Sequence, residues 1–135
     1  MRARATLEQA LAILRGDAPA AYARLLAELD GLTVALQVDG ERFALRGAEF
    51  RLHFDDGGGA ALIDLRTTRR TIVALIDGEL SLLDAVLART LAVRAEARQL
   101  DRIARAGRHF ADGALRSRRM RALLDRFRAD EPSAA

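Results

Sequence analysis

The hydrophobic pattern between Leu32 and Leu115 changes its period in a definite order, and this order constrains the fold more than any other feature. Apolar residues first recur at every second position, which is typical of strands with one buried face. They then follow helical spacing, return once to alternation, and finish in a long amphipathic helix. The alternating segments are Leu32–Val38, Arg42–Arg46, Glu49–Asp55, Ala61–Thr67 and Thr90–Glu96.

The connections between the first four strands are expected to be short. Asp39-Gly40 and Arg46-Gly47 suit tight hairpins, and Asp56–Gly59 suits a looser turn. Strands so closely spaced favour an antiparallel meander. One face of such a sheet is apolar, so helices must cover it.

Helices are expected on both sides of the strand region. Thr6 with Gln9 predicts a capping box at the start of the first helix. The chain is predicted to form one domain of the α+β class, a five-stranded, mostly antiparallel sheet with helices covering one face. Its parts over residues 1–135 are N-terminal helices in 6–29, strands within 32–67, a helical pair at 71–89, a strand at 90–96 and C-terminal helices in 97–128.

Composition excludes several kinds of site and of location. The chain has no cysteine, which excludes disulfides and cysteine-ligated metals. The two histidines, His53 and His109, are far apart, and no ligand spacing predicts a metal site. No apolar run approaches the ~18 residues that span a membrane, and the N-terminus lacks the apolar core of a signal peptide. We therefore expect a cytoplasmic protein.

Nucleophilic catalysis requires a nucleophile, a base and an orienting group. Ser81 is better explained as the N-cap of a helix that begins at Leu82, with Asp84 as its capping partner. Neither His53 nor His109 has a second catalytic group at an informative spacing. The sequence thus predicts no catalytic residue and no cofactor, and hence no enzyme.

Positive charge is concentrated in the C-terminal helices. All 22 basic residues are arginine, and Ala97–Arg128 contains ten of them against three acidic residues, a net charge of +7. These arginines have three interpretations: a solvated polar face, a peripheral contact with an anionic membrane, or nucleic-acid binding. The scarcity of aromatic residues for base stacking disfavours nucleic acid, so none is expected as a partner.

One turn carries a resemblance to a known family. Residues Ile76–Ser81 have the sequence Ile-Asp-Gly-Glu-Leu-Ser and lie between the two predicted middle helices. With Leu82–Leu87 and Leu91–Ala95, this turn resembles the corresponding turn, helix and last strand of sterol carrier protein type 2 domains. The resemblance lies in the order and spacing of elements over about three quarters of the chain. The family usually has a glycine before and after the last strand, whereas this chain has Arg89 or Thr90 and then Ala95 or Glu96.

The resemblance implies a function in lipid binding. In the family, the apolar sheet face and its helices enclose a tunnel, so we expect non-catalytic binding or carriage of a fatty acyl, isoprenoid or sterol-like molecule. In a bacterial-looking chain, a sterol is the least favoured of the three. The helix Arg118–Arg128 is expected to pack over the cavity mouth and to be displaced by anionic membranes. The residues expected to line the cavity are Phe50, Leu52, Phe54, Ile72, Ile76, Leu83, Val86, Leu87, Phe110, Met120, Leu124 and Phe127.

A second interpretation stays open at this point. The domain would then be a ligand-free interaction or accessory module that docks a protein partner through its arginine-rich C-terminal helices. Some relatives act in this way in isoprenoid quinone biosynthesis. An apolar cavity favours the carrier, whereas a fully packed interior favours the module. The oligomeric state is left undetermined.

Overall fold

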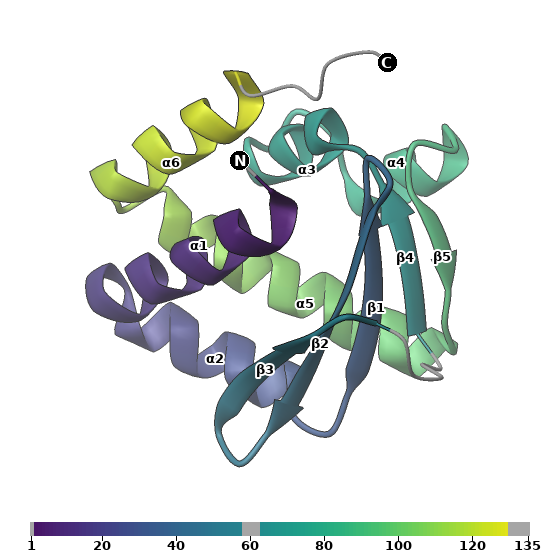
Figure 1. Cartoon of the computed structure of the whole chain (residues 1–135), viewed down its shortest axis with the longest axis horizontal. Helices are drawn as coiled ribbons and strands as arrows, with labels where there is room; N and C mark the ends of the chain where they lie inside the picture. Colours follow the sequence, from purple (N-terminus) through teal and green to yellow (C-terminus); the bar gives the residue numbers. More distant parts are fainter. Residues whose placement is uncertain (1, 58–62, 130–135) are drawn as a thin grey trace.

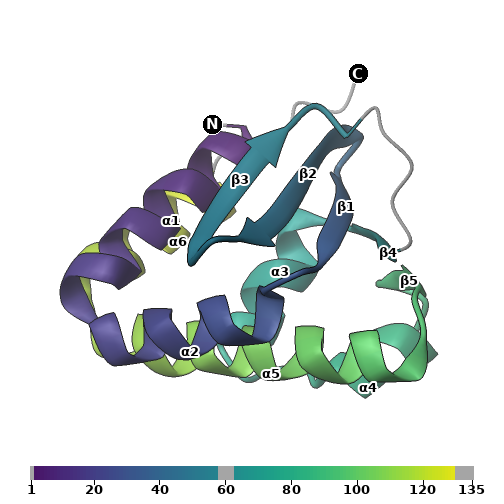
Figure 2. The ribbon, with the colours of Figure 1, turned by 90° about the horizontal axis from the view of Figure 1, so that it is seen from below.

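A computed structural model describes residues 2–57 and 63–129 of the chain (Figure 1). It contains a five-stranded sheet with helices packed against it, which confirms the predicted α+β class. Figure 2 shows α1, α2 and α5 together on one side of the sheet. The elements in chain order are α1 (Ala3–Asp17), α2 (Pro19–Leu29), β1 (Thr33–Val38), β2 (Glu41–Ala48), β3 (Arg51–Asp55), β4 (Ile63–Thr67), α3 (Arg69–Ile76), α4 (Leu82–Leu87), β5 (Ala92–Arg94), α5 (Ala97–Ala114) and α6 (Arg118–Ala129).

The strand order is β3-β2-β1-β4-β5, so the predicted simple meander is wrong. β4 does not pair with β3 but runs parallel to β1, with Val34 opposite Ile63 and Leu36 opposite Leu65. The other three pairs are antiparallel, as predicted. Alternation identifies a strand's buried face, but it does not select the neighbouring strand. Ala61 and Leu62 of the predicted fourth strand, and Gly58 and Gly59 of the predicted turn, lie outside the described residues.

Only one of the two predicted tight hairpins forms where expected. Asp39 and Gly40 have φ of 51° and 86°, as a type I′ turn requires. β2 instead continues through Arg46-Gly47, so the second predicted turn is wrong. This strand position is a glycine because the end of α2 approaches it: a Cβ on Gly47 would clash with the Leu29 carbonyl oxygen. The Gly47 N–H donates to the carbonyl of Leu32 at 3.0 Å, just beyond α2.

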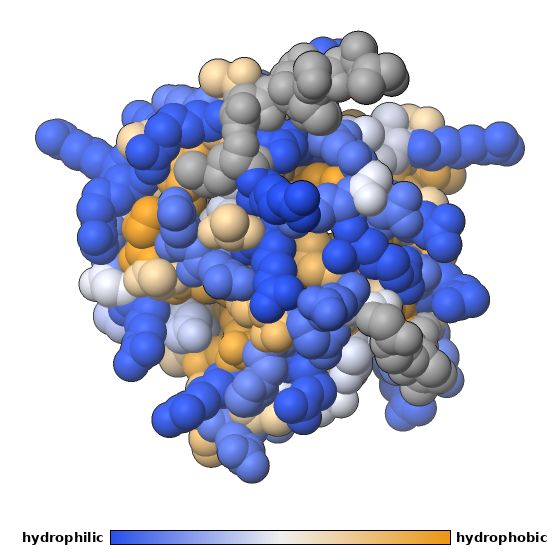
Figure 3. Space-filling view, in the orientation of Figure 1, coloured by the Kyte–Doolittle hydropathy of each residue, from blue (hydrophilic) through white to orange (hydrophobic). Residues whose placement is uncertain are grey.

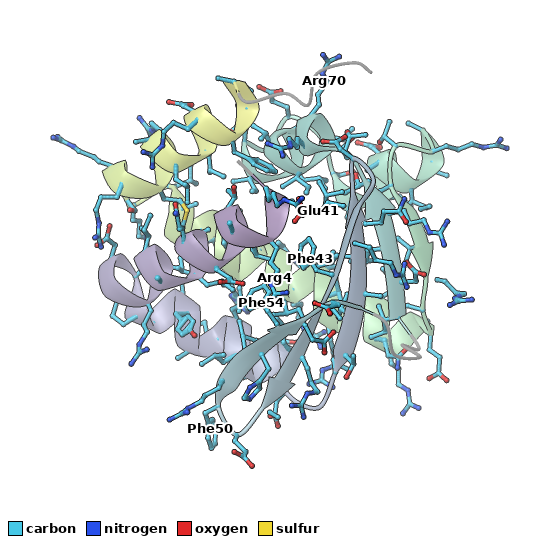
Figure 4. All side chains as sticks on the ribbon, viewed as in Figure 1. Arg4, Glu41, Phe43, Phe50, Phe54 and Arg70 are labelled. Carbon is cyan, nitrogen blue, oxygen red and sulfur yellow. The ribbon has the colours of Figure 1, made fainter. Side chains whose placement is uncertain are left out.

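The second hairpin turns at Glu49 and Phe50. Both residues have positive φ, 55° and 60°, although neither is glycine. The third strand therefore begins at Arg51 instead of Glu49. As a consequence Phe50 lies at the turn and is 88% exposed, away from the apolar face on which the sequence placed it (Figure 4).

The start of α1 also differs from the prediction. The helix begins at Ala3, and the carboxylate of Glu41 accepts hydrogen bonds from the backbone N–H groups of Ala3 (2.7 Å) and Arg4 (3.1 Å). An acidic group stabilises a helix N-terminus in this way. The predicted Thr6–Gln9 capping box is wrong, because Thr6 lies inside the helix and donates to the carbonyl of Arg2.

The turn between α3 and α4 has the predicted form. Gly78 has a φ of 76°, and its N–H donates to Leu75 while that of Glu79 donates to Ala74. This pair of hydrogen bonds is a Schellman motif, which ends α3. Ser81 then caps α4 by accepting from the backbone N–H of Asp84 at 3.0 Å, as predicted.

Candidate functional site

A groove of about 410 Å³ lies between α1, α2 and the edge strand β3. α1 supplies most of one wall, α2 supplies one residue, and β3 supplies two residues of the opposite wall. The lining residues are Arg4, Glu8, Leu11, Ala12, Arg15, Tyr22, Leu52 and Phe54. The groove therefore opens at the sheet edge formed by β3, beside α1.

The apolar part of the groove follows from two periodicities. Leu11 shares the buried face of α1 with Leu14, and Leu52 and Phe54 are alternate residues of β3. The Phe54 ring stacks on Phe43 with 6.3 Å between ring centroids, and Phe43 is only 2% exposed. Figure 4 shows Phe43 and Phe54 close to Arg4. The apolar floor of the groove is thus continuous with the core.

The rim of the groove is charged. The Nε of Arg4 lies 2.9 Å from Oε1 of Glu8, and its Nη1 lies 3.6 Å from Oδ1 of Asp56. Arg15 is exposed and has no ion pair with any residue that the structure describes. A second hollow of about 310 Å³ continues past Arg4 towards Glu41. An apolar floor with charged groups at its mouth suits a molecule that has both an apolar body and a polar end.

Eight of the twelve predicted cavity residues lie in the core between sheet and helices. Met120 and Phe127 are almost fully buried, and the other six are half-buried against the two core clusters. Only Leu52 and Phe54 line the groove. The eight residues are Leu52, Phe54, Ile72, Ile76, Phe110, Met120, Leu124 and Phe127.

The other four lie at the surface. Phe50 is in the β2–β3 turn, and Leu83, Val86 and Leu87 are on the outer face of α4, with 67%, 36% and 72% of their surface exposed. A contact between these residues and a ligand stays a prediction, as does a tunnel between the apolar sheet face and its helices. Both hollows described above are lined by α1, α2 and the β2–β3 region instead.

The sequence did not identify the α1 side of the groove. Leu11 shares an apolar stripe with Leu14, which predicts burial, yet no local pattern shows that α1 lies beside β3. Arg4, Glu8 and Arg15 are spaced like any solvated helix face. Their common position at one groove depends on contacts between segments some 40 residues apart, such as that of Glu41 with Ala3.

α6 is held to the body of the domain at both ends. Near its start, Asp17 accepts hydrogen bonds from the Ser117 hydroxyl (2.5 Å) and from the Arg119 guanidinium (2.6 Å and 3.2 Å). These bonds, from Arg119 first and then Ser117, lower the pKa of the Asp17 carboxyl below its ordinary value. Near its end, Arg128 donates to Asp77. Between these points the helix packs on α1 and α3.

Residues 2–57 and 63–129 show no features of a metal site or a membrane-spanning helix. This part of the chain contains no group of three or more His, Cys, Asp or Glu side chains placed to hold a metal ion. His53 lies on the polar sheet face opposite Arg46, and His109 is half-buried in α5. None of the helices in these ranges is both long and apolar enough to cross a membrane.

Sequence comparison alone does not classify the chain. No family model matches it, and no curated protein matches it. Three solved structures are similar in fold at low sequence identity. They show the same architecture over about four fifths of this chain.

The first is the ubiquinone synthesis protein UbiJ-SCP2, with 17% identity and a TM-score of 0.62 over 80% of this chain and 89% of that chain. The second is the sterol carrier protein domain 2 of Helicoverpa armigera, with 14% identity and a TM-score of 0.59 over 79% and 89%. The third is sterol carrier protein 2 of Yarrowia lipolytica in its apo form, with 13% identity and a TM-score of 0.54 over 76% and 89%. The predicted resemblance is thereby confirmed at the level of the fold, and this chain is a domain with the sterol carrier protein 2 fold.

Proposed function

We propose that this domain binds and carries a hydrophobic small molecule, such as a fatty acyl, isoprenoid or sterol-like lipid, and catalyses no reaction. The observation that carries the proposal is the groove between α1 and β3, whose apolar floor joins the core in a fold shared with sterol carrier domains. Its volume of about 410 Å³ lies in the range of small-molecule sites. Removal of apolar ligand surface from water would drive binding.

The distribution of charge in the groove favours one orientation of the ligand. The apolar body would lie on Leu11, Leu52 and Phe54, and the polar end would remain at the rim. Arg15 is available there to an acidic head group, since it has no ion pair among the described residues. This arrangement favours an amphipathic lipid over a purely apolar hydrocarbon.

The absence of catalysis is part of the proposal. Two of the three serines serve as helix caps: Ser81 accepts from the N–H of Asp84, and Ser117 accepts from the N–H of Met120. Ser133 lies outside the described residues.

We also propose that the protein acts in the cytoplasm and receives its cargo at an anionic membrane surface.

Organic extraction of the purified protein, followed by mass spectrometry, tests the proposal directly. We expect a lipid with an acidic or otherwise polar head group to co-purify in a defined molar ratio. Recovery of no lipid, together with no binding of a fluorescent fatty acid, would contradict carriage by this domain.

A groove-blocking variant tests the location. Ala12 is exposed and lines the groove, whereas Ala23 is exposed on α2 and is not among the lining residues. Ala12→Trp should fill the groove and weaken binding of a fluorescent fatty acid by about tenfold or more, a loss of ~1.4 kcal/mol. Ala23→Trp is the matched control and should bind like wild type. Equal affinities would place the ligand elsewhere.

A second candidate function is that of an accessory module for isoprenoid quinone biosynthesis. Its support is the structural similarity to the ubiquinone synthesis protein and the exposed arginines of α5 and α6. Deletion of the gene in its source organism should then lower the cellular content of isoprenoid quinone. Wild-type quinone levels in the deletion strain would contradict this candidate and leave the carrier proposal standing.

A further inference from the structure

One end of the molecule carries a net positive charge equal to that of the whole chain. Residues 12–22 and 112–121, which we call the basic end, contain five arginines and two aspartates, a net charge of +3. The whole chain also has a net charge of +3, so the other 114 residues are formally neutral. This uneven distribution of charge favours one orientation of the domain at a negatively charged surface.

Contacts between helix ends assemble the basic end. The α1–α2 corner and the α5–α6 corner meet through Asp17, which binds both Ser117 and Arg119. Gly113 lies so close to the Leu14 side chain that a Cβ there would clash with it, and Ala18 is also close, at 3.3 Å from that Cβ position. Figures 1 and 2 both show these two corners at the same end of the molecule, away from α4 and β5. The two sequence segments therefore form one surface.

Most arginines of the basic end make no ion pair with any residue that the structure describes. Asp17 is occupied by Arg119 and Ser117. Arg15, Arg116, Arg118 and Arg121 are exposed, and none of them has an ion pair among the residues that the structure describes. These four side chains are free to contact a negatively charged partner.

An exposed leucine lies among these arginines. Leu115 directly follows α5 and precedes Arg116, and 67% of its surface is exposed. Figure 3 shows hydrophilic side chains over much of the face it draws, with apolar residues between them. A large apolar side chain surrounded by cations suits the interface of an anionic bilayer, where the cations contact head groups and the leucine enters the acyl boundary.

We infer that the basic end is the surface by which this domain docks on an anionic membrane. Charge complementarity supports a lipid surface with acidic head groups, and exposed Leu115 favours it over a purely ionic partner. No aromatic residue other than Tyr22 belongs to the basic end, which disfavours single-stranded nucleic acid because base stacking requires aromatic side chains.

The docking surface adjoins the groove. Arg15 belongs to the basic end and also lines the groove between α1 and β3. Docking would therefore bring the groove near the bilayer while α6 remains in place. Transfer of cargo between groove and bilayer rests on the proposed carrier function. Docking itself does not, because vesicle binding is measured without added cargo.

Vesicle binding by the full chain tests the surface. Arg116, Arg118 and Arg121 are replaced together by Gln, and all three lie outside the groove lining. Each arginine near an anionic surface contributes about fivefold in affinity, so the triple variant should bind phosphatidylglycerol-containing vesicles about a hundredfold more weakly. Raised salt should weaken wild-type binding. Vesicles of phosphatidylcholine alone should bind little.

The matched control removes three exposed arginines from elsewhere. Arg46, Arg51 and Arg98 also have no ion pair among the described residues, and their replacement by Gln removes the same net charge. This variant should retain most of the wild-type affinity. Equal losses in the two triple variants would overturn the inference, because binding would then depend on total charge and not on the basic end.

A tryptophan reporter identifies the face that meets the bilayer. The chain has no tryptophan, and Leu115 and Leu83 are equally exposed at 67%. The fluorescence of Leu115→Trp should shift to the blue on addition of anionic vesicles, and that of Leu83→Trp should not. A shift confined to Leu83→Trp would assign docking to α4 instead.

Tighter binding to single-stranded RNA than to vesicles at the same salt would assign the basic end to nucleic acid.

Discussion

Helices α4 and α6 carry similar apolar stripes, but only α6 buries its stripe. In α6, Met120 and Leu123 are 0% exposed and Phe127 is 3% exposed. In α4, Leu83 and Leu87 are 67% and 72% exposed, and the side buried against the protein is occupied by Ala85. The sequence placed residues of both helices around the same cavity. Apolar periodicity therefore identifies a helix without showing which of its sides faces the core.

The difference follows from how each helix is anchored. α6 has twelve residues, lies against α1 and α3, and is tied by Asp17 at its start and Asp77 at its end. α4 has six residues and lies between two Schellman turns, one at Gly78 and one at Arg89. These turns hold the helix through backbone hydrogen bonds at its two ends. A long helix with anchored ends can bury a full stripe, whereas a single short helix contributes one small residue to the core.

The largest difference between the two helices is expected when a leucine of each is replaced by alanine and the free energies of unfolding are compared. Leu123→Ala removes a fully buried side chain from the core and should lower the free energy of unfolding by about 2–5 kcal/mol. Leu83→Ala removes an exposed side chain and should change it by less than about 0.5 kcal/mol. Urea unfolding followed by circular dichroism measures both. Similar losses in the two variants would mean that α4 packs as tightly as α6.

Local patterns predicted most of the elements. The alternation of β1 and β5, the Ser81 cap and the turn at Gly78 all depend on neighbouring residues, so the sequence identified them. Features that depend on distant segments were missed. The sequence predicts a turn at Gly47, but this strand position is glycine because Leu29, far away in sequence, approaches it in space.

The candidate site shows the same division between local and distant information. The alternation of β3 predicts that Leu52 and Phe54 share the apolar face, the family resemblance implies that they contact a ligand, and both line the groove. The facing residues of α1 were not expected, because no local pattern shows that α1 lies beside β3. The Ala3 N–H donates to Glu41 of β2, and this contact joins segments that are distant in the sequence. The crossing of β4 to β1 was missed for the same reason, since no local signal selects a strand's partner.

The anchor of α6 should respond to pH in one direction. The folded state lowers the pKa of Asp17, mainly through the hydrogen bonds from Arg119. A lowered acid pKa stabilises the folded state above the unfolded-state value near 3.9, and this stability is lost as pH falls through the folded-state pKa. Asp17→Asn should therefore be less stable than wild type at pH 7, and the difference should shrink as pH falls below the unfolded-state value and disappear below the folded-state pKa.

An exposed aspartate provides the control for that anchor. Asp112 lies at the same end of the molecule and has no ion pair among the described residues. Asp112→Asn should match wild type at pH 7 in urea unfolding. If Asp17→Asn also matches wild type at pH 7, the Asp17 bonds do not anchor α6, and its burial must come from packing alone.

The smallest expected effect concerns the end of α4. Arg89 has a φ of 62° at the C′ position of a Schellman turn, with its N–H donating to Val86 and that of Thr90 donating to Ala85. Glycine is the usual residue there because a left-handed conformation strains any side chain with a Cβ. Arg89→Gly relieves this strain but gives the unfolded chain more conformational entropy, so we expect a net gain of only about 0.5 kcal/mol in unfolding free energy.

The contrasting control is Arg98→Gly, in the first turn of α5, where the backbone is helical. This variant should lose up to about 1 kcal/mol of unfolding free energy. A loss of stability in Arg89→Gly comparable to that in Arg98→Gly would mean that the arginine side chain makes a contact at α4 that outweighs the backbone strain, and α4 would then be anchored by side chains, as α6 is.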